Sequence, residues 1–503
     1  MSAEDTPTVA TKGFRAPETD HRFFGHPMGL ATLFTTELWE RFSYYGMRAI
    51  LILYFVAPAS DGGLAMATGT AIAIYGVYSA MVYLLAVPGG WLADRVMGPR
   101  RAVLWGAIVI ALGHYVMAVP TNWSAWPGLA FIAVGTGLLK PNISSMVGDL
   151  YDGDTDDGTR RTSGFSLYYM GINIGGFLAP LVCGYLGEGI GWHVGFAAAG
   201  IGMTIALVAY VAFAPRTLGP IGKPIPDEAP MTLKRKVLLT STAALGVVGI
   251  GLLILNLFGL YSADLVIAIL TVICVVTPII YFARIFRNPN LTETEAHRMR
   301  AYVWIFVGAV MFWLIFDQMG STINLFVQNS TDRHIFDFEI PAAWLQSVNS
   351  LGVIVLAPVY AWLWIRLGRK APSLPTKFAF AIVMIGLSFL LMGLLGKMAE
   401  SQLVPWEFVV VMLLIQVLAE LLLSPTGMAA STQLAPKGMS SQVMALWFLA
   451  VAVGDSIGGQ VGRLQPVLGD AMYFTMLGVI AIIVAIIFST QIAKLKRLMG
   501  GVH

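Results

Sequence analysis

An apolar stretch over residues 29–58 carries four charged side chains, which are Glu37, Glu40, Arg41 and Arg48. The stretch is about long enough to cross a bilayer once as a helix. Each charge is expected to cost roughly 2.5–3.5 kcal/mol at mid-membrane, so four unpaired charges would cost on the order of 10 kcal/mol. Tyr44 and Tyr45 join them within an arc of about 140° on a helix of 3.6 residues per turn. This face is therefore predicted to line a polar cavity rather than to contact lipid.

The composition indicates a polytopic membrane protein. Of the 503 residues, 57% are hydrophobic and only 12% are charged, and the mean hydropathy is positive. The apolar segments are too long and too numerous for a soluble α/β enzyme. The two cysteines, Cys183 and Cys274, both lie in apolar segments and are predicted to pack there, without a disulfide or a zinc site. Residues 1–27 are polar, which predicts a short disordered tail and no signal peptide.

Hydropathy and turn residues predict an all-α membrane protein with fourteen transmembrane helices. The predicted spans are 28–58, 69–94, 102–119, 124–149, 163–186, 193–214, 237–258, 262–283, 301–329, 341–365, 378–396, 405–432, 441–462 and 470–492. An even number of spans places both termini on one side.

Lysine and arginine indicate which side that is, because cytoplasmic loops carry an excess of both. Of the 31 lysines and arginines, 25 lie in the tails and loops on the side of the termini. Only Arg333, Lys397 and Arg463 lie in the opposite loops, and three more lie within spans. The distribution predicts that both termini lie in the cytoplasm, and we expect the protein in the plasma (inner) membrane.

A repeated loop divides the chain into two halves. The span at 69–94 runs into Gly90-Trp91-Leu92-Ala93-Asp94-Arg95 and continues to Arg101, and a weaker copy, Arg366-Leu367-Gly368-Arg369-Lys370, follows the span at 341–365. Leaving out the spans at 237–258 and 262–283 gives two six-helix halves, as in transporters built from parallel repeats. The first of these loops resembles the signature loop of the major facilitator superfamily. The predicted segments are 1–27 (cytoplasmic N-tail), 28–214 (N-terminal bundle), 215–300 (linkers with an inserted two-helix hairpin), 301–492 (C-terminal bundle) and 493–503 (cytoplasmic C-tail).

Opposite charges occupy equivalent spans of the two halves. Lys140 precedes Pro141 in one span, and Glu420 lies five residues before Pro425 in the other. Proline disturbs the preceding helical turn, which marks both helices as bent or mobile. With Arg48 beside Lys140, one end of the cavity is positive and the other is negative. Such polarity suits a zwitterion with a carboxylate and an amine, although the same charges could simply pair to join the halves.

Further polar residues lie at mid-span. Asp317 could pair with Lys140 or bind a proton, and the amides of Asn173 and Asn349 could both donate to and accept from a peptide group. The alternative for either asparagine is an interhelical polar contact. Asp455 is unusual in its span, and its sequence context suggests no role.

The motif Glu37-x-x-Glu40-Arg41-Phe42-x-Tyr44-Tyr45 resembles the hallmark of the proton-dependent oligopeptide transporter family. Tyr169-x-x-Ile172-Asn173-x-Gly175 resembles the second signature of this family. The fourteen spans with an inserted pair are similar to its bacterial members, and the resemblance covers essentially the whole chain.

The resemblance implies symport of protons with di- and tripeptides by alternating access of the two bundles. It assigns proton coupling to Glu37, Glu40 and Arg41, with Asp317, where many relatives carry glutamate, as a further coupling residue. It assigns the peptide carboxylate to Arg48 and Lys140. It implies that Glu420, Asn173 and Asn349 bind the amino terminus and backbone of the peptide. The side-chain pocket positions are Tyr44, Tyr45, Tyr83, Trp313 and Trp447.

Two alternatives remain at this point. A proton-coupled transporter of nitrate or another small anion is the nearest, but a simple anion has no amine for Glu420 to bind. A membrane enzyme is disfavoured, because the sequence has no His-Glu-x-x-His motif, no nucleophile elbow and no phosphate-binding Gly-Lys loop. We expect no cofactor, no metal and no nucleic-acid partner, contact with membrane lipid, and a monomer.

Overall fold

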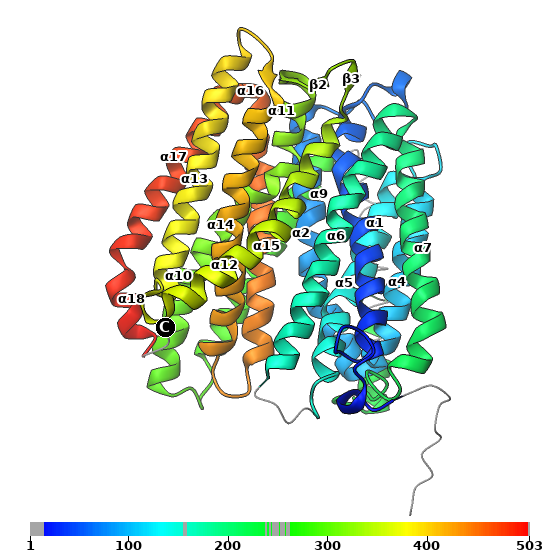
Figure 1. The fold of residues 1–503 in the computed structure, drawn as a ribbon, viewed down its shortest axis with the longest axis vertical. Helices are drawn as coiled ribbons and strands as arrows, with labels where there is room; N and C mark the ends of the chain where they lie inside the picture. Colours follow the sequence, from blue (N-terminus) through cyan, green and yellow to red (C-terminus); the bar gives the residue numbers. More distant parts are fainter. Residues whose placement is uncertain are drawn as a thin grey trace, which may run out of the picture.

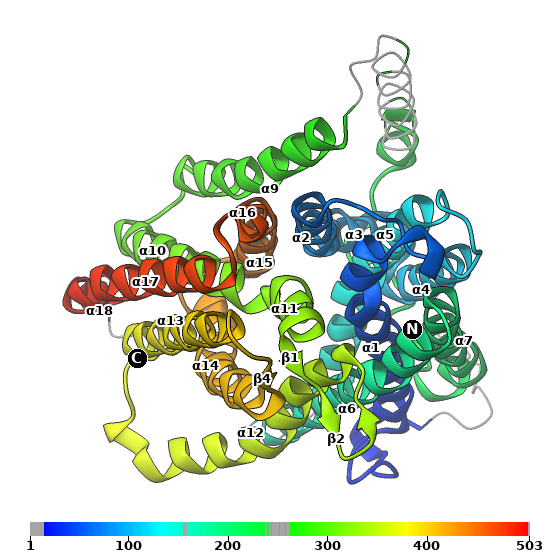
Figure 2. The ribbon, with the colours of Figure 1, turned by 90° about the horizontal axis from the view of Figure 1, so that it is seen from above.

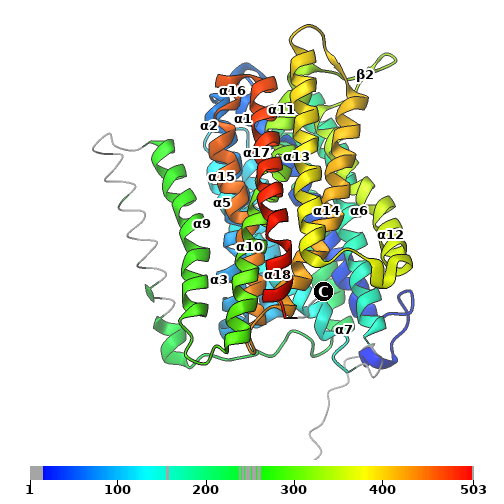
Figure 3. The same ribbon diagram turned by 90° about the vertical axis from the view of Figure 1, so that its left-hand side faces the viewer.

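The structure is a computed structural model that describes residues 15–153, 158–236 and 262–500, with residues 239, 240, 243, 251 and 257. It is a bundle of long helices that run between two ends (Figure 1). We call the end that carries residues 15–27 and α18 (Ile492–Leu498) the terminal end. The opposite end carries a short hairpin of β2 (His334–Ile335) and β3 (Phe338–Glu339), and we call it the hairpin end (Figure 3).

The N-terminal half contains one helix for each of its six predicted spans, and one of these helices is interrupted. Its helices are α1 (Met28–Val56), α2 (Thr68–Leu84) with α3 (Ala86–Leu92) and the π-helical turn η3 (Ala93–Met97), α4 (Pro99–Met117), α5 (Ala125–Asp149), α6 (Thr159–Gly189) and α7 (Trp192–Thr217). The first helix packs against α6 and α7, while α4 packs against α5. The charged helix α1 therefore packs mainly within its own half.

The C-terminal half has the same plan. Its helices are α10 (Glu293–Phe316) with η4 (Asp317–Gly320) and α11 (Thr322–Ser330), η5 (Ala342–Gln346) with α12 (Ser347–Leu367), α13 (Leu374–Ala399), α14 (Trp406–Gln433), α15 (Ser440–Gly462) and α17 (Asp470–Thr490). Short elements complete the described chain, namely η1 (Pro17–Thr19), η2 (Ala59–Asp61), β1 (Thr331–Asp332), β4 (Val404–Pro405), η6 (Gly368–Lys370) and α16 (Gln465–Leu468). The strands β1 and β4 pair in parallel at the hairpin end.

The two halves meet along two helix pairs. Helix α2 packs against α15, and α6 packs against α12. The first pair approaches closely at Gly76, where an added Cβ would lie 2.6 Å from the carbonyl oxygen of Asp455 and from Cα of Gly459. Small residues let helix backbones approach in this way in membranes.

The span predicted at 262–283 is α9 (Ala263–Phe286), which contacts both α2 and α15 and so lies across the junction of the halves (Figure 2). Its Asp264 accepts a hydrogen bond from Arg463 at 2.6 Å. The other span of the inserted pair, predicted at 237–258, falls almost wholly outside the described residues.

Ten helical segments of the described chain are long and apolar enough to cross a membrane. The chain is therefore a multi-pass helical membrane protein, while the count of fourteen spans stays a prediction. Helices α1, α4 and α5 lie in the bundle but are not among the ten. In α1 the reason is its four charged residues, Glu37, Glu40, Arg41 and Arg48.

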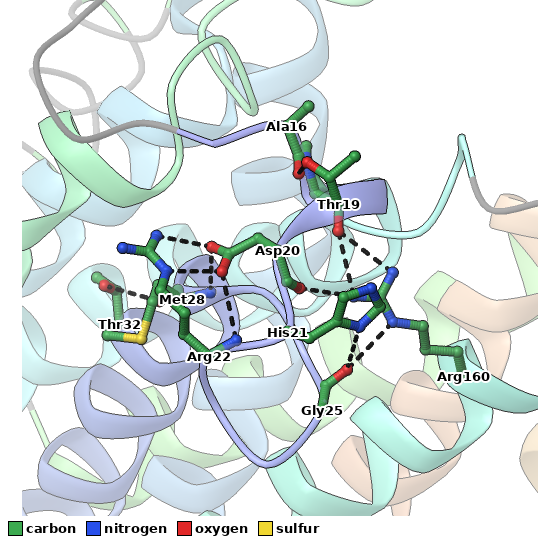
Figure 4. Close-up of polar contacts among 10 residues, drawn as sticks. Ala16, Thr19, Asp20, His21, Arg22, Gly25, Met28, Thr32 and Arg160 are labelled. Atoms are coloured by element: carbon green, nitrogen blue, oxygen red, sulfur yellow. Dashed lines mark hydrogen bonds and ion pairs between the residues drawn. The ribbon is translucent and has the colours of Figure 1, made fainter.

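The beginning of the described chain is a folded segment. A tail that is disordered over residues 1–27 was expected, but residues 15–27 contain η1 and dock on the start of α6, and residues 1–14 lie outside the described part (Figure 4). Arg160 donates hydrogen bonds to the carbonyl oxygens of Pro17, Asp20 and Gly25 at 3.2, 2.7 and 3.3 Å. These contacts order the segment in a way that its polar composition did not reveal.

The same segment caps the first transmembrane helix. The Asp20 carboxylate accepts a hydrogen bond from the Met28 amide at 3.0 Å and from the Arg22 guanidinium at 2.7 and 2.8 Å. These bonds hold the pKa of Asp20 near 2, below its ordinary value. A carboxylate at this place satisfies an amide that α1 leaves unpaired at its beginning.

Helix α10 begins at Glu293, eight residues before the start of the span predicted at 301–329. A capping box explains the early start, because Thr292 and Glu295 each accept a hydrogen bond from the backbone of the other. Both cysteines are free and buried, as expected for packing residues.

Candidate functional site

The charged face of α1 points into the protein. Glu37, Glu40 and Arg41 are each no more than 2% exposed. Arg41 donates to both oxygens of Glu40, with Nη2 at 2.7 Å from Oε1, and its Nε lies 3.3 Å from Oε1 of Glu37. The other oxygen of Glu37, Oε2, has no hydrogen-bond partner within the described part of the chain. One arginine thus holds two carboxylates, and Glu37 is held less completely than Glu40.

Two aromatic rings cover the same arginine. The guanidinium carbon of Arg41 lies 5.1 Å from the ring centre of Tyr44 and 5.9 Å from that of Tyr45. The rings themselves are edge to face at 5.3 Å. Cation–π contacts of this kind are worth about 2 kcal/mol when desolvated, so they add to the ion pairs that fix Arg41.

Arg48 connects the two halves. Its Nε donates to the Tyr75 hydroxyl of α2 at 2.7 Å, and its Nη2 donates to Oδ1 of Asp317 in η4 at 2.5 Å. The same nitrogen lies 3.3 Å from the Asp317 carbonyl oxygen. The sequence left open whether Asp317 pairs with Lys140, and in this structure its partner is Arg48.

Lys140 lies on α5 one residue before Pro141, which falls inside the helix. Its ammonium nitrogen lies 4.2 Å from the ring centre of Tyr83 on α2. Within the described residues it has no carboxylate within ion-pair distance. The lysine is therefore a buried cation held by an aromatic face, with its charge available to a further anion.

Glu420 provides the opposite charge from α14, five residues before Pro425 inside that helix. The Asn349 amide of α12 donates to its Oε2 at 3.5 Å. Asn173 of α6 donates instead to the carbonyl oxygen of Tyr169 in its own helix, at 2.9 Å. The structure thus brings Asn349 to Glu420, while no hydrogen bond to the Asn173 side-chain oxygen is found among the described residues.

Two tryptophans from the C-terminal half stand beside each other. The rings of Trp313 and Trp447 are edge to face with centres 6.5 Å apart, and Nε1 of Trp313 makes no hydrogen bond in the described part of the protein. A buried indole N–H without a partner is expected to bind an acceptor. These two rings are therefore suited to line a pocket.

Tyr45 shows that the charges of both halves converge. It interacts electrostatically with Arg41 and Arg48 of its own half, and with Glu420 and Asp317 of the other half. Charges of both signs from α1, η4 and α14 thus act on one tyrosine near the middle of α1. We call the region around Tyr45 the chamber.

The chamber is closed toward the hairpin end. The Ala49 carbonyl oxygen accepts from Asn324 at 2.8 Å and from Gln346 at 3.2 Å. The Glu188 carboxylate of α6 accepts from the amides of Ala342 and Ala343 at 2.8 and 3.0 Å. These bonds join the two halves over the chamber.

Toward the terminal end, the described residues show no hydrogen bond between the halves. Instead, a polar face of α6 includes Thr162, Ser166, Tyr169 and Asn173, which recur at helical spacing. An open cavity of about 470 Å³ lies along the first turns of this helix, from Gly158 to Ser166. Within the described residues, hydrogen bonds between the halves therefore close the hairpin end and not the terminal end, where this cavity lies.

Three residues of this site were missed by the sequence analysis. Tyr75 is one of many aromatic residues in the spans, and Glu188 lies just past the predicted end of its span at 186. Asp455 was noted as unusual but was given no role. Charged or polar groups within or beside apolar helices were the available signal, while their partners depend on the packing of the two halves.

The chain is similar to known transporters in both sequence and fold. The POT family matches residues 100–467. A di-/tripeptide transporter of Lactococcus lactis subsp. cremoris is 38% identical over 499 residues, which cover 97% of this chain and 99% of the relative. A crystal structure of a peptide transporter POT in complex with sulfate is 41% identical and superposes with a TM-score of 0.93, covering 97% of this chain and 99% of that one. A POT family transporter in complex with 5-aminolevulinic acid is 35% identical, with a TM-score of 0.91 and coverage of 96% and 100%.

Proposed function

The chain belongs to the POT family, and on this premise we propose that it is a proton-coupled symporter that imports di- and tripeptides by alternating access. The observation that carries the proposal is the meeting of opposite charges from the two halves around Tyr45. A short peptide is a zwitterion, so its carboxylate and its amine need partners of opposite sign at the two ends of one chamber.

In the proposed binding mode, Arg48 and Lys140 bind the peptide carboxylate. Lys140 supports this role because no carboxylate within the described residues occupies it. Glu420 and Asn349 bind the amino terminus, and the side-chain oxygen of Asn173 accepts from the peptide backbone. Tyr44, Tyr45, Tyr83, Trp313 and Trp447 form the walls around the peptide side chains. A related transporter binds 5-aminolevulinic acid, which also carries an amine and a carboxylate.

The proposed coupling uses Glu37, Glu40 and Arg41, together with Asp317. Arg41 is bound to two carboxylates, so one negative charge of this buried triad is uncompensated, and Glu37 has the oxygen without a partner. A proton on Glu37 makes the triad neutral. Separating a buried ion pair is costly, because it leaves uncompensated charges. Protonation of Glu37 removes its ion pair with Arg41, so the protonation state of Glu37 and the position of Arg41 are linked.

The two six-helix bundles are proposed to be residues 28–214 and 301–492, with α9 as part of an inserted accessory pair. We propose that the terminal end is cytoplasmic, because the excess of lysine and arginine lies on that side. A state in which hydrogen bonds between the halves close the hairpin end, with none at the terminal end among the described residues, is then inward-facing. The chain is proposed to act as a monomer.

Transport of nitrate or another small anion is the alternative function. Arg48 and Lys140 would serve such a substrate as well, but Glu420 would then face no amine. Glu420 is partly buried, and Asn349 is its hydrogen-bond partner at a long 3.5 Å. The presence of this acid in the chamber therefore favours a substrate that carries a positive group.

Purified protein in liposomes tests the proposal. An inward proton gradient should drive accumulation of a labelled dipeptide, and unlabelled dipeptide should compete whereas nitrate should not. Arg48→Ala should weaken peptide binding. Glu37→Gln or Glu40→Gln should abolish accumulation against a gradient but leave peptide exchange intact. Dipeptide uptake that persists unchanged after the gradient is dissipated would contradict the coupling, and competition by nitrate alone would support the alternative.

A further inference from the structure

A small cavity of about 10 Å³ lies between α2, η4 and α15, with room for about one water molecule. Two acidic residues line it, Asp317 of η4 and Asp455 of α15. Asp317 is the partner of Arg48, whereas the proposed function gives Asp455 no role. The cavity lies beside a close contact of the two halves, because Gly76 of α2 also lines it.

Asp455 is buried without a donor. It is 4% exposed, and neither of its carboxyl oxygens has a hydrogen-bond partner in the part of the chain that the structure describes. Oδ2 of Asp317 lacks a partner in the same way. Both acidic residues line the same cavity, which has room for about one water molecule. Two facing carboxylates cannot satisfy one another, because each accepts hydrogen bonds and neither donates.

The charges near the two acids do not balance them. Arg48 is the guanidinium that contacts Asp317, so two carboxylates share one close cation. Tyr75 provides no charge and receives a hydrogen bond from Arg48. The titratable and charged groups that surround Asp455 come from five elements and are Arg48 of α1, Tyr75 and Tyr83 of α2, Lys140 of α5, Cys274 of α9 and Asp317 of η4.

One proton removes both problems. A protonated carboxyl group donates a hydrogen bond to the other, so two of the three orphaned oxygens gain a partner. Arg48 then balances the single remaining negative charge. Pairs of carboxyl groups that share one proton titrate as a unit. We propose that Asp455 holds this proton against Asp317 and that it is a second proton-binding residue of the transport cycle, an inference that rests on the proposed function.

The proton on Asp455 controls the partner of Arg48. While Asp455 is protonated, its O–H can bind the Asp317 carboxylate, so Arg48 is able to leave Asp317 for the carboxylate of a peptide. When the O–H bond of Asp455 breaks and water takes the proton away, two carboxylates face each other. Arg48 then returns to them and the peptide carboxylate is released. Binding of the proton and binding of the peptide therefore favour each other.

Asp455→Asn tests the proposal, because asparagine keeps the shape and a hydrogen-bond donor but cannot release a proton. In liposomes that contain the full-length protein, accumulation of a labelled dipeptide driven by a proton gradient should fall about tenfold or more, the effect of roughly one unit of lost proton linkage. Exchange of internal for external dipeptide, which requires no net proton movement, should stay within about twofold. The dependence of dipeptide affinity on pH should flatten.

The matched control is Asp470→Asn. Asp470 is a partly buried acid at the start of α17 that accepts a hydrogen bond from Gln465, outside the chamber. This variant should accumulate dipeptide as the wild type does. Asp455→Asn would overturn the proposal if it kept wild-type accumulation and pH dependence. Loss of accumulation and exchange together would also overturn it, because the role of Asp455 would then be structural.

Infrared difference spectroscopy gives a measurement that does not depend on transport. The wild-type protein near neutral pH should show the carbonyl band of a protonated carboxyl group, which Asp455→Asn removes and Asp470→Asn retains. A spectrum that is the same in all three proteins would refute a proton on Asp455. If the wild type accumulated no dipeptide, the proposed function would fail, while the infrared band would still decide whether Asp455 holds a proton.

Discussion

Glu188 joins the two halves at the hairpin end, and its replacement by alanine should open that end. The carboxylate accepts hydrogen bonds from the first two amides of η5, those of Ala342 and Ala343. Because η5 continues into α12, Glu188 lies at the beginning of a helix, where a negative charge is favourable. Arg333 lies 3.7 Å from the same carboxylate.

The expected size of the effect follows from these bonds. Hydrogen bonds to charged groups contribute about 1.5–3 kcal/mol each, and both amides are nearly inaccessible at 1% and 0% exposure of their residues. Water can satisfy the amides only after the ends separate, so the loss acts on the closed state alone. We take the closed state to lose about 2–4 kcal/mol of stability in total. This loss shifts the equilibrium between the closed and the separated hairpin end about 30- to 700-fold toward separation.

Pulsed electron paramagnetic resonance on protein in lipid nanodiscs can measure this shift. Spin labels at Ser60 and Ser401 would report the separation of the halves, because both residues are exposed and lie in different halves, Ser60 in η2 after α1 and Ser401 between α13 and β4. The native cysteines are buried, which favours labelling of introduced ones. Glu188→Ala should add a population at longer distance to the one found in the wild type.

Glu339→Gln is the matched control for this experiment. Glu339 also pairs with Arg333, at 2.6 Å, but its side chain is 53% exposed. Exposed pairs contribute about 0–1 kcal/mol, so the distance distribution should change less than about fivefold in population. The reasoning fails if Glu188→Ala leaves the distribution unchanged, or if Glu339→Gln shifts it equally.

Three further predictions concern other parts of the molecule. The pKa of Asp20 is lowered to about 2, so the docking of residues 15–27 should be complete above about pH 4 and be lost as the pH falls toward 2. Asp20→Asn should weaken this docking by about 1–2 kcal/mol at neutral pH, a value that allows for the exposure of its partner Arg22. Hydrogen exchange measures both effects. Gly76→Ala should lower the free energy of unfolding by about 1–3 kcal/mol, because an added Cβ would lie 2.6 Å from the backbone of α15. Gly189→Ala should leave the thermal stability unchanged, because Gly189 has open space around it. Lys140→Ala should weaken dipeptide affinity about 10- to 150-fold in a competition assay, as expected for loss of one charge-assisted hydrogen bond, and unchanged affinity would exclude it from the binding site.

Long apolar segments made most of the fold predictable. The helices of the described chain coincide with the predicted spans because only helices satisfy the backbone within lipid, so hydropathy alone locates them. The ends are less predictable, since they depend on local hydrogen bonds. Thr292 and Glu295 extend α10 beyond the apolar segment, and Arg160 orders a polar segment that composition alone describes as a tail.

Partners within the site were less predictable than the site itself. The four charges of α1 on one face indicated a cavity, and Arg41 does lie inside the protein with both glutamates. Whether Asp317 meets Lys140 or Arg48 depends on how far η4 reaches into the other half, which no local pattern encodes. Glu188 and Asp455 acquire their importance in the same way, from contacts across the junction.

The Arg48–Asp317 pair affects the step of the transport cycle in which the empty protein reorients. A carrier has to reorient empty, and a bare guanidinium in the middle of the membrane would make that return slow, because an unpaired buried charge costs several kcal/mol. Asp317 pairs with Arg48 while no peptide is bound, so this guanidinium keeps an ionic partner in the empty protein. A peptide carboxylate has to displace Asp317 from Arg48 in order to bind. This competition limits the affinity for the peptide and speeds its release on the other side of the membrane.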